Sequence, residues 1–459
     1  MLDGPTSIPA PLPHPRAAIG TRPAPRASDG GVGSSDYAPG RIVFGAGRAD
    51  RIADEVVALG HRVFVVCGRA WAIRSGRLER IVADLAAAGG TAFPFPEVEP
   101  DPSLATIERG AALVRERRSD AVLAVGGGSA IDAAKAIALR ATNDGPATRY
   151  RGERAPEDPL PVVAVPTTAG TGSEVTPYAV MLDPASGRKV TIKDRRLVPA
   201  VAIVDPRLCL GAPAETIAAA GVDAFFHGLG AFLLRNDDPL TWPYAASAMR
   251  LALRHLGRFL ADPGNAGAAE GMALAALHGG VAVSRRRTGV IHTMANHLGA
   301  ALGLPHGVSL ALCAPPALAW NLPHLPAARH DALAGLFGSP PGECREEQTA
   351  RVLDGIRSLL ESAGVAAAGR ARLATAGPPD IDRLVASVAT DAGLPAVNLA
   401  PYSLEEVRRL FREVLASAFV GAPSQARQIQ SVAPGKALLR RLAILISPYF
   451  SRTRAGERP

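Results

Sequence analysis

The chain has 459 residues, of which 47% are hydrophobic and 20% are charged; this composition is typical of globular proteins with a large core and excludes a disordered chain. The length predicts two or three domains. The formal net charge is +8, but aromatic residues make up only 5% of the chain and the arginines are spread along it, so the sequence lacks the basic, aromatic-rich stripe of a nucleic-acid-binding protein.

The first forty residues are rich in proline, glycine, alanine and serine, and we interpret residues 1–40 as a disordered extension. They lack the uninterrupted apolar segment of a signal peptide, and their prolines would break the helix of a transit peptide. No other stretch approaches the roughly 18 apolar residues of a membrane span, so we expect no membrane partner. Four widely spaced cysteines predict reduced thiols in a cytoplasmic protein, each packed as a small core residue: Cys67, Cys209, Cys313 and Cys344.

Residues 41–209 alternate between strand and helix patterns. Short buried strands are predicted within 41–47, 61–68, 91–98 and 121–125, and amphipathic helices within 48–60, 76–90 and 102–120. Such alternation is typical of a parallel sheet with helices on both faces. The sequence therefore predicts an α/β domain over residues 41–209.

A glycine turn follows the buried strand 121–125. Gly126, Gly127 and Gly128 stand where the strand gives way to a helix, so backbone amides and a helix N-terminus would point at one place, which suits a pyrophosphate. A tight strand-to-helix connection would also explain three glycines. Ser129 adds a hydroxyl that can donate to phosphate, and Asp132 lies in the first turn, where a carboxylate also favours the helix dipole.

A second polar loop follows the next buried strand, 162–165, which ends at Pro166. Open α/β sheets bind ligands at the carboxyl ends of their strands, so we interpret this loop as a ligand contact. Its polar residues are Thr167, Thr168, Thr171, Ser173 and Glu174. Residues 181–206 then predict a hairpin and a further strand, in which Lys189 and Lys193 alternate with apolar residues as on a solvated face.

From about Leu210 the pattern becomes helical, with long stretches rich in alanine and leucine, and residues 210–450 are predicted to form a helical domain. The boundary falls between Asp205 and Pro213. Ser403 and Glu406 form a capping box before a helix. The apolar and basic segment 434–450 is interpreted as a packed terminal helix rather than a membrane-surface helix, and residues 451–459 as a frayed tail.

Histidines and one aspartate in this helical part predict a metal site. Asp223 and His227 are four residues apart, so on a helix they project from one face and can hold one ion. His292, His297 and His306 lie together further along the chain. One carboxylate with two or three of these imidazoles would hold a divalent ion with a position left open for a substrate oxygen.

Three motifs stand in order: GGGSAID at 126–132, PTTAGTGSE at 166–174, and the pair GVDAFFH at 221–227 with GVIHTMANHLGAALGLPHG at 289–307. Together they resemble the iron-containing (group III) alcohol dehydrogenase superfamily, which includes the maleylacetate reductases. The resemblance extends over residues 41–321. It implies a Rossmann-type dinucleotide-binding domain, an all-α domain in the arrangement of dehydroquinate synthase, an active site between them, and a homodimer or larger homo-oligomer.

The resemblance also implies roles for particular residues. The metal ligands would be Asp223, His227, His292 and His306, holding Fe²⁺ or Zn²⁺. Gly127, Gly128 and Ser129 would hold the pyrophosphate of NAD or NADP, and Asp132 would support that turn. Further cofactor contacts would come from Thr167, Thr168, Thr171 and, near the nicotinamide ribose, Lys189.

Two positions depart from the family pattern. The histidine that commonly follows the third ligand by four residues is replaced by Asn296, and the neighbouring His297 would point about 100° away on a helix. Where many members carry an acid for the adenosine ribose, this chain has Gly68 followed by Arg69. Without the acid a 2′-phosphate is not repelled, and Arg69 could pair with it, so NADP is an alternative to NAD.

These observations predict hydride transfer between NAD(P)H and an aldehyde, ketone or alcohol, with the metal polarising the substrate oxygen. Three alternatives stand beside this interpretation. The first is a maleylacetate reductase-like enzyme that reduces an enone or keto acid, with or without metal. The second is a cyclase of the dehydroquinate synthase type, and the third is a non-catalytic dinucleotide-binding scaffold that has lost turnover through Asn296.

Overall fold

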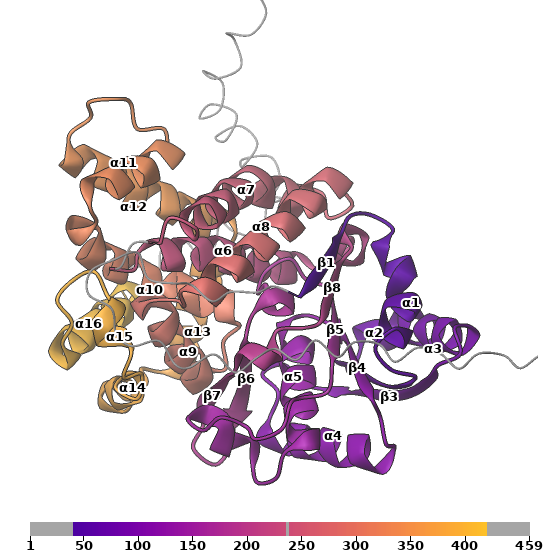
Figure 1. The fold of residues 1–459 in the computed structure, drawn as a ribbon. Coiled ribbons are helices and arrows are strands. Elements are labelled where there is room, and N and C mark those ends of the chain that lie inside the picture. Colours follow the sequence, from indigo (N-terminus) through magenta and orange to yellow (C-terminus); the bar gives the residue numbers. More distant parts are fainter. Residues whose placement is uncertain (1–39, 236–237, 420–459) are drawn as a thin grey trace, which may run out of the picture. The chain divides into compact units, whose positions relative to one another are not determined.

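The computed structural model describes residues 40–235 and 238–419. The predicted N-terminal extension, the predicted terminal helix at 434–450 and the tail at 451–459 lie outside the described residues. Within the described part, strands and helices alternate up to Val204 and helices follow from Ala214 onward (Figure 1). The predicted fold class, a parallel α/β domain followed by an all-α domain, is confirmed.

Six parallel strands form the main sheet in the order β1-β8-β5-β4-β2-β3. Their bounds are Arg41–Phe44 for β1, Arg62–Gly68 for β2, Thr91–Val98 for β3, Ala121–Gly126 for β4, Val162–Pro166 for β5 and Val201–Val204 for β8. The order reverses at β2, because β3 lies on one side of it and β4 on the other. Ligands of open α/β sheets bind outside the carboxyl ends of the strands at such a reversal, which here is the end where Gly68 and Gly126 lie.

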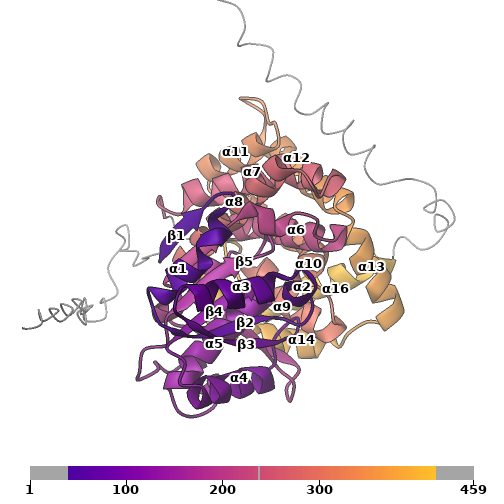
Figure 2. The same ribbon diagram turned by 90° about the vertical axis from the view of Figure 1, so that its right-hand side faces the viewer.

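Helices cover both faces of the sheet because successive strand residues point to opposite faces. In β2, Val63 and Val65 pack into the core beneath α1 (Ile52–Val57), α2 (Trp71–Arg74) and α3 (Arg77–Ala87). Phe64 and Val66 pack into the core beneath α4 (Leu104–Glu116) and α5 (Gly128–Thr142). Figures 1 and 2 show α1 and α3 over one face and α4 and α5 over the other. The continuous apolar runs of these strands therefore reflect burial on two sides.

Strands β6 (Tyr178–Asp183) and β7 (Arg188–Lys193) form an antiparallel hairpin that is separate from the main sheet. Its cross-strand pairs alternate between two faces. One face is apolar and packs into the core beneath α4 and α5: Ala179, Met181, Val190 and Ile192. The opposite face carries Tyr178, Val180 and Leu182 from β6 and Lys189, Thr191 and Lys193 from β7. Because α9 packs against β7, the hairpin borders the helical domain.

The helical domain is built on α6, α7 and α8, which pack against one another. The described helices are α6 (Ala214–Phe232), α7 (Trp242–Ala261), α8 (Ala266–Arg285), α9 (Val290–Leu302), α10 (His306–Asn321), α11 (Ala327–Leu336), α12 (Arg345–Ser362), α13 (Val365–Ala376), α14 (Ile381–Val388), α15 (Leu394–Val397) and α16 (Leu404–Phe419). One large apolar core joins nearly all of them. The predicted cap is present, since the Glu406 amide donates to Ser403 Oγ over 3.1 Å.

Two expectations from the sequence were wrong. Helix α8 does have the length and hydropathy of a membrane span, but 72% of that stretch is buried inside the protein, as expected for a core helix packed between α6 and α7. Cys67, Cys209 and Cys313 are buried, whereas Cys344 is exposed rather than packed in the core. Cys344 precedes α12 as its N-cap residue, so it lies at a helix end on the surface.

Candidate metal centre and cofactor site

The glycine turn fits closely against the polar loop that follows β5. This loop carries Thr167, Thr168 and Thr171 and is called the threonine loop below. Helix α5 begins at Gly128, directly after β4. A Cβ atom on Gly128 would lie 2.6 Å from Thr171 Cγ2, and one on Gly127 would lie 3.1 Å from Thr168 Oγ1. The backbone of Gly126 has a φ of 156°, which a larger side chain rarely adopts. Glycine at these positions thus lets the two predicted cofactor loops touch at the carboxyl ends of β4 and β5.

This place has the properties of a pyrophosphate site. The first amides of a helix have no carbonyl partner within the helix, and they carry the positive end of its dipole. In α5 these are the amides at the glycine turn, and they lie beside the reversal of strand order where open sheets bind ligands. Thr167, which is buried, and Thr168 follow β5 at the same edge.

Asp101, which the sequence analysis did not single out, joins Ser129 to Lys189. The Asp101 amide donates to Ser129 Oγ over 3.2 Å, and Lys189 Nζ donates to Asp101 Oδ1 over 2.7 Å. Asp101 has a φ of 52°, in the left-handed region that aspartate tolerates better than most residues. Lys189 is therefore an ion-paired residue beside the glycine turn and not a solvated one.

Asp132, which the resemblance places in support of the glycine turn, reaches from α5 to the threonine loop and to β6. Its carboxylate accepts a hydrogen bond from Ser173 Oγ and one from the Val180 amide, the latter over 3.0 Å. It therefore ties α5 to the threonine loop and to β6. Burial raises the pKa of the Asp132 carboxyl, against the opposing charge of Lys135.

Lys135 is a fully buried lysine that sequence reasoning missed. Its Nζ donates to Ser173 Oγ, to the carbonyl and hydroxyl oxygens of Thr176, and to the Tyr178 carbonyl, at distances of 2.9 to 3.1 Å. Burial lowers its pKa to about 8. The carboxyl of Glu174, only 2% exposed, has its pKa raised to about 7 by burial. The sequence does contain an indication that this lysine is buried, because Lys135 is the only polar residue between Ala133 and Leu139.

The metal ligands that the resemblance implied come together at one carboxylate oxygen. Three imidazole nitrogens surround Asp223 Oδ1: Nε2 of His227 at 3.5 Å, of His292 at 3.7 Å and of His306 at 3.5 Å. Asp223 and His227 lie one turn apart on α6, His292 lies on α9, and His306 is the first residue of α10. Asp223, His227 and His292 each place a ligand atom within 4.8 Å of the other two.

Glycines bring these helices close enough for the ligands to meet. A Cβ on Gly307 would lie 2.1 Å from the Ala219 carbonyl oxygen, so glycine after His306 lets α10 approach the backbone of α6. A Cβ on Gly230 would lie 3.3 Å from His292 Nδ1. The glycine in the LPHG segment therefore has a packing role that positions His306.

The cluster fits a divalent metal ion. Tetrahedral metal–nitrogen and metal–oxygen bonds of about 2.1 Å place neighbouring ligand atoms about 3.4 Å apart, close to the separations seen here. Asp223 Oδ1 and His292 Nε2 are buried without a hydrogen-bond partner in the part of the chain that the structure describes. Buried polar atoms without a partner are costly, and a shared cation would satisfy both.

The protonation states also suit metal binding. Burial lowers the pKa of His292 to about 4 and that of His306 to about 3, so both imidazoles are neutral at pH 7. Burial alone would raise the pKa of the Asp223 carboxyl, but His227, His306 and His292 outweigh it and leave that pKa below its usual range. Neutral imidazoles and an ionised carboxylate are the forms that bind metals.

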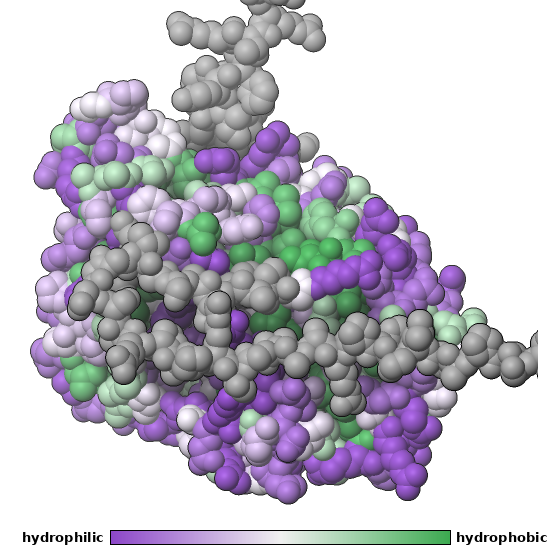
Figure 3. Space-filling view, viewed as in Figure 1, coloured by the Kyte–Doolittle hydropathy of each residue, from purple (hydrophilic) through white to green (hydrophobic). Residues whose placement is uncertain are grey.

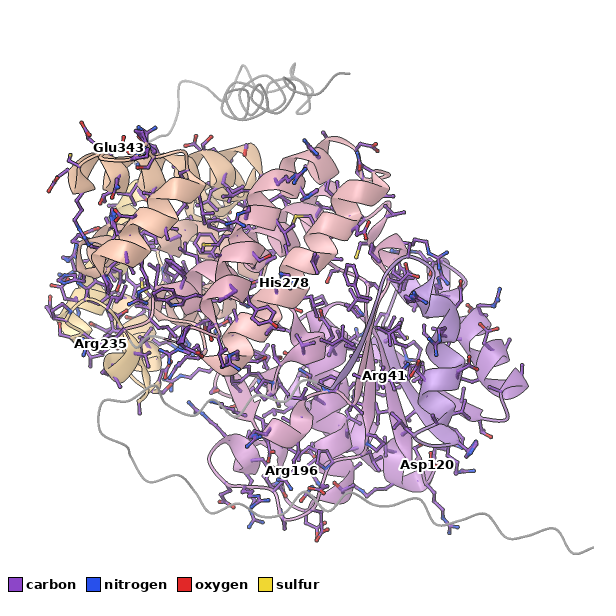
Figure 4. The ribbon with its side chains drawn as sticks, turned by 45° about the horizontal axis from the view of Figure 1, so that its top comes forward. Arg41, Asp120, Arg196, Arg235, His278 and Glu343 are labelled. Atoms are coloured by element: carbon purple, nitrogen blue, oxygen red, sulfur yellow. The ribbon has the colours of Figure 1, made fainter. Side chains whose placement is uncertain are left out.

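The other histidines of this region lie elsewhere. His297 is on α9 but is not in the group around Asp223; burial lowers its pKa to about 4, helped by the charge of Arg188. Asn296 is partly buried and follows His292 by four residues, so it lies on the same face of α9. His278 on α8 bonds instead to Ser247 Oγ over 2.8 Å and is seen among the helices in Figure 4.

Arg69, which directly follows β2, already contacts two residues. Its Nε donates to the Glu97 carbonyl over 3.0 Å, and its Nη2 lies 3.7 Å from Glu99 Oε2. Burial would raise the pKa of the Glu99 carboxyl, but hydrogen bonds from Ser103 and Thr106 lower it. An ionised acid therefore stands beside Arg69 at the edge where the adenosine ribose of a dinucleotide would lie.

Two family models match the chain. Residues 39–206 match the model for iron-containing alcohol dehydrogenase, and residues 217–415 match the C-terminal model of the Fe-containing alcohol dehydrogenase family. Together the two matches span both domains, and all four clustered ligands lie in the second.

Several similar proteins are alcohol dehydrogenases or related oxidoreductases. NAD-dependent methanol dehydrogenase of Bacillus methanolicus is 33% identical over 62% of this chain and 75% of its own. Alcohol dehydrogenase 4 of Schizosaccharomyces pombe is 30% identical over 83% of this chain and 89% of its own. The crystal structure of a 1,3-propanediol oxidoreductase superposes with a TM-score of 0.77 at 30% identity, over 83% of this chain and 100% of the other.

Proposed function

Because this chain belongs to the iron-containing alcohol dehydrogenase family, and is thus an oxidoreductase that moves a hydride between a nicotinamide cofactor and an alcohol or carbonyl compound, we propose that its reaction centre is the Asp223 cluster. In this proposal Asp223, His227, His292 and His306 hold Fe²⁺. The convergence of three imidazole nitrogens within 3.7 Å of one buried carboxylate oxygen supports this assignment.

Each part of the chain has a separate task. A bound divalent ion polarises a substrate oxygen and stabilises negative charge on it, and a bound nicotinamide supplies or accepts the hydride. The glycine turn at Gly126–Gly128, with Ser129, holds the pyrophosphate, and Thr167, Thr168 and Thr171 line the cofactor. Lys189, fixed by Asp101, lies between the two sites and faces the ribose. Asp132 and Lys135 hold the threonine loop in place.

The test is turnover together with metal content. We expect protein purified without oxygen or chelators to contain about one iron per chain by elemental analysis and to oxidise NADH with butanal. Removing the metal with a chelator is expected to abolish turnover, and Fe²⁺ to restore it, because a Lewis acid lowers the activation barrier by several kcal/mol. Turnover that persists in protein stripped of metal would contradict the proposal and favour the metal-free reductase instead.

NAD is the cofactor that the site favours. A 2′-phosphate that paired with Arg69 would also meet the ionised carboxylate of Glu99, which lies 3.7 Å from Arg69 Nη2. We expect kcat/KM for NADH to exceed that for NADPH by about tenfold or more. The Glu99→Gln variant keeps an oxygen acceptor for Ser103 but lacks the charge, so it should narrow this ratio. Equal use of both cofactors by the unmodified protein would contradict the argument.

A homodimer or larger homo-oligomer is also proposed. β1 is one of the two edge strands of the described sheet, and edge strands present unpaired backbone groups that another chain can meet. Hydrophobic residues gather near β1 and α8 on the face in Figure 3. Ile42 of β1 is 36% exposed. Light scattering of the full chain should give at least twice 47.4 kDa; a monomer mass at micromolar concentration would contradict this.

A further inference from the structure

The threonine loop also contacts the helical domain, and glycines make these contacts close. A Cβ atom on Gly170 would lie 2.7 Å from the Cα atom and from the carbonyl oxygen of Ala220 on α6. One on Gly172, which has a φ of 62°, would lie 2.5 Å from the Cα atom of Gly280 on α8. A side chain at either position would push the loop away from the helices. The loop therefore packs against α6 and α8 through backbone atoms.

Both contacts lie beside metal ligands. Ala220 precedes Asp223 by three residues, or about one turn of α6. Gly280 follows Gly279, on which a Cβ atom would lie 3.0 Å from His227 Cβ. The threonine loop is thus packed against the backbone that positions two ligands, Asp223 and His227.

A third ligand depends on the same turn of α6. Gly307 directly follows His306, and a Cβ atom on it would lie 2.1 Å from the Ala219 carbonyl oxygen. Ala219 and Ala220 are neighbours, so adjacent residues of α6 contact the start of α10 and the threonine loop. Packed interiors transmit small displacements, so a shift of this turn would change the separation between His306 and Asp223.

The opposite side of the threonine loop contacts the glycine turn, where Gly127 meets Thr168 and Gly128 meets Thr171. The loop is also held to α8, because Ser284 Oγ donates to the Val175 carbonyl over 2.8 Å. The loop therefore lies between the predicted pyrophosphate site and the helices that carry the metal ligands.

The ligand cluster needs support from its surroundings. Asp223 Oδ1 and His292 Nε2 are buried and have no hydrogen-bond partner in residues 40–235 and 238–419. Without a cation, such atoms favour a movement of the ligands away from each other and towards water. The packing of the threonine loop against α6 opposes that movement.

We propose that Gly170 and Gly172 are positioning residues that connect the cofactor site to the metal centre, so that cofactor and metal each strengthen the binding of the other. A ligand that orders the threonine loop also orders the turn of α6 before Asp223. The second ligand then loses less conformational entropy when it binds. This inference rests on the proposed function, because it requires a metal at the Asp223 cluster and a dinucleotide at the glycine turn.

The experiment measures metal binding with and without a ligand of the cofactor site. That ligand is ADP-ribose, which carries the pyrophosphate but lacks the nicotinamide that would approach the metal; about 0.3 M salt screens its charge. Chelator-treated full chain is titrated with Co²⁺, whose visible absorption reports binding to imidazole and carboxylate ligands. We expect saturating ADP-ribose to lower the Co²⁺ dissociation constant by about fivefold or more.

The coupling is also expected in the reverse direction. Saturating Co²⁺ should lower the dissociation constant of ADP-ribose, measured by calorimetry, by the same factor, because coupling between two binding sites is reciprocal. A factor smaller than about fivefold in the unmodified protein would overturn the proposal.

Two variants with opposite steric effects test the contact itself. Gly170→Ala crowds the loop against α6, whereas Ala220→Gly removes the Cβ atom next to Gly170 and loosens the same contact. Each variant should reduce the coupling factor by about threefold or more, because the loop no longer fixes the turn before Asp223. Circular dichroism reports whether each variant folds. Ala220→Gly introduces no clash and decides the outcome if Gly170→Ala does not fold; a smaller reduction in Ala220→Gly would overturn the proposal.

Gly355→Ala is the matched control. A Cβ atom on Gly355 would lie 2.2 Å from Phe337 Cδ1, an equally close contact, but it lies between α12 and the end of α11, which carry none of the four proposed ligands. This variant should keep the coupling factor. A loss there would attribute the effect to general destabilisation and overturn the proposal. Failure of the proposed function is distinguishable, because the unmodified protein would then bind no Co²⁺ at the cluster and would not turn over butanal.

Discussion

The His292→Ala variant is expected to lose turnover by about a thousandfold or more and to lose its bound metal. His292 Nε2 lies 3.7 Å from Asp223 Oδ1, and both atoms are buried without a hydrogen-bond partner. Without this imidazole only three protein ligands would remain, and these are expected to bind the ion too weakly to retain it. The contribution of a Lewis acid to hydride transfer is several kcal/mol, which corresponds to this loss of rate. Elemental analysis and NADH oxidation measure the two effects.

His278→Ala is the matched control for His292→Ala. Both histidines lie on helices of the same domain, but His278 bonds to Ser247 and is outside the cluster. We expect His278→Ala to keep one metal per chain. NADH binding, measured by fluorescence, should persist in both variants, because the glycine turn lies on the other domain. Retained metal and activity in His292→Ala would show that the cluster around Asp223 is not the reaction centre.

Local patterns were sufficient to predict the fold. Apolar strand runs followed by amphipathic helices specify a parallel sheet, because only strands buried on both faces read as continuous apolar segments. The turn at Gly126–Gly128 could also be predicted, since few backbone conformations connect a buried strand to a helix so tightly. In these cases the cause lies within about ten residues of its effect.

The choice among histidines could not be made from residue types alone. His292, His297 and His306 have the same side chain, and only the packing of α6, α9 and α10 decides which of them reach Asp223. That packing depends on contacts such as Gly307 against the Ala219 carbonyl, which join residues almost ninety positions apart. Helical phase shows only that His297 points away from His292.

The ion pairs and hydrogen bonds at the carboxyl edge of the sheet could not be predicted from the sequence either. Arg69 was expected to be able to pair with a 2′-phosphate, but Glu99, which directly follows β3, lies beside it. Lys189 was found next to Asp101, and Lys135 among the oxygens of a loop about forty residues away. Each partner is distant in sequence, so spacing rules based on i and i+4 neighbours do not detect it.

Replacing Lys135 by methionine is expected to lower the free energy of unfolding by about 3–5 kcal/mol, the usual cost of removing one member of a buried charged group. Methionine keeps the length of the side chain, so the loss reflects the ammonium. Four hydrogen bonds from Nζ to the loop between Ser173 and Tyr178 disappear. Asp132 and Glu174 also lose a positive charge that opposes their desolvation. Urea unfolding measures the change.

The cost of Lys135→Met should increase with pH. The pKa of Glu174 is about 7 in the folded protein, against an ordinary value of 4.5, so the stability this group confers is complete below pH 4.5 and is lost as the pH rises through 7. Without Lys135 the folded pKa of Glu174 rises further, and the loss continues above pH 7. Lys135 acts in the same direction: its folded pKa of about 8 lies below 10.5, so the unmodified protein gains stability as the pH rises above 8.

The Lys135→Met/Glu174→Gln variant separates charge from packing. Glutamine removes the carboxylate whose ionisation is costly without Lys135, so the double variant should regain part of the lost stability at pH 8 and little at pH 6. Unfolding by urea at these two pH values, together with the single Glu174→Gln variant, completes a double-mutant cycle. A cost of Lys135→Met that is the same at both pH values, or below about 1 kcal/mol, would mean that the buried ammonium does not compensate Asp132 and Glu174. The threonine loop would then be held mainly by the contacts of Gly127 and Gly128 with Thr168 and Thr171.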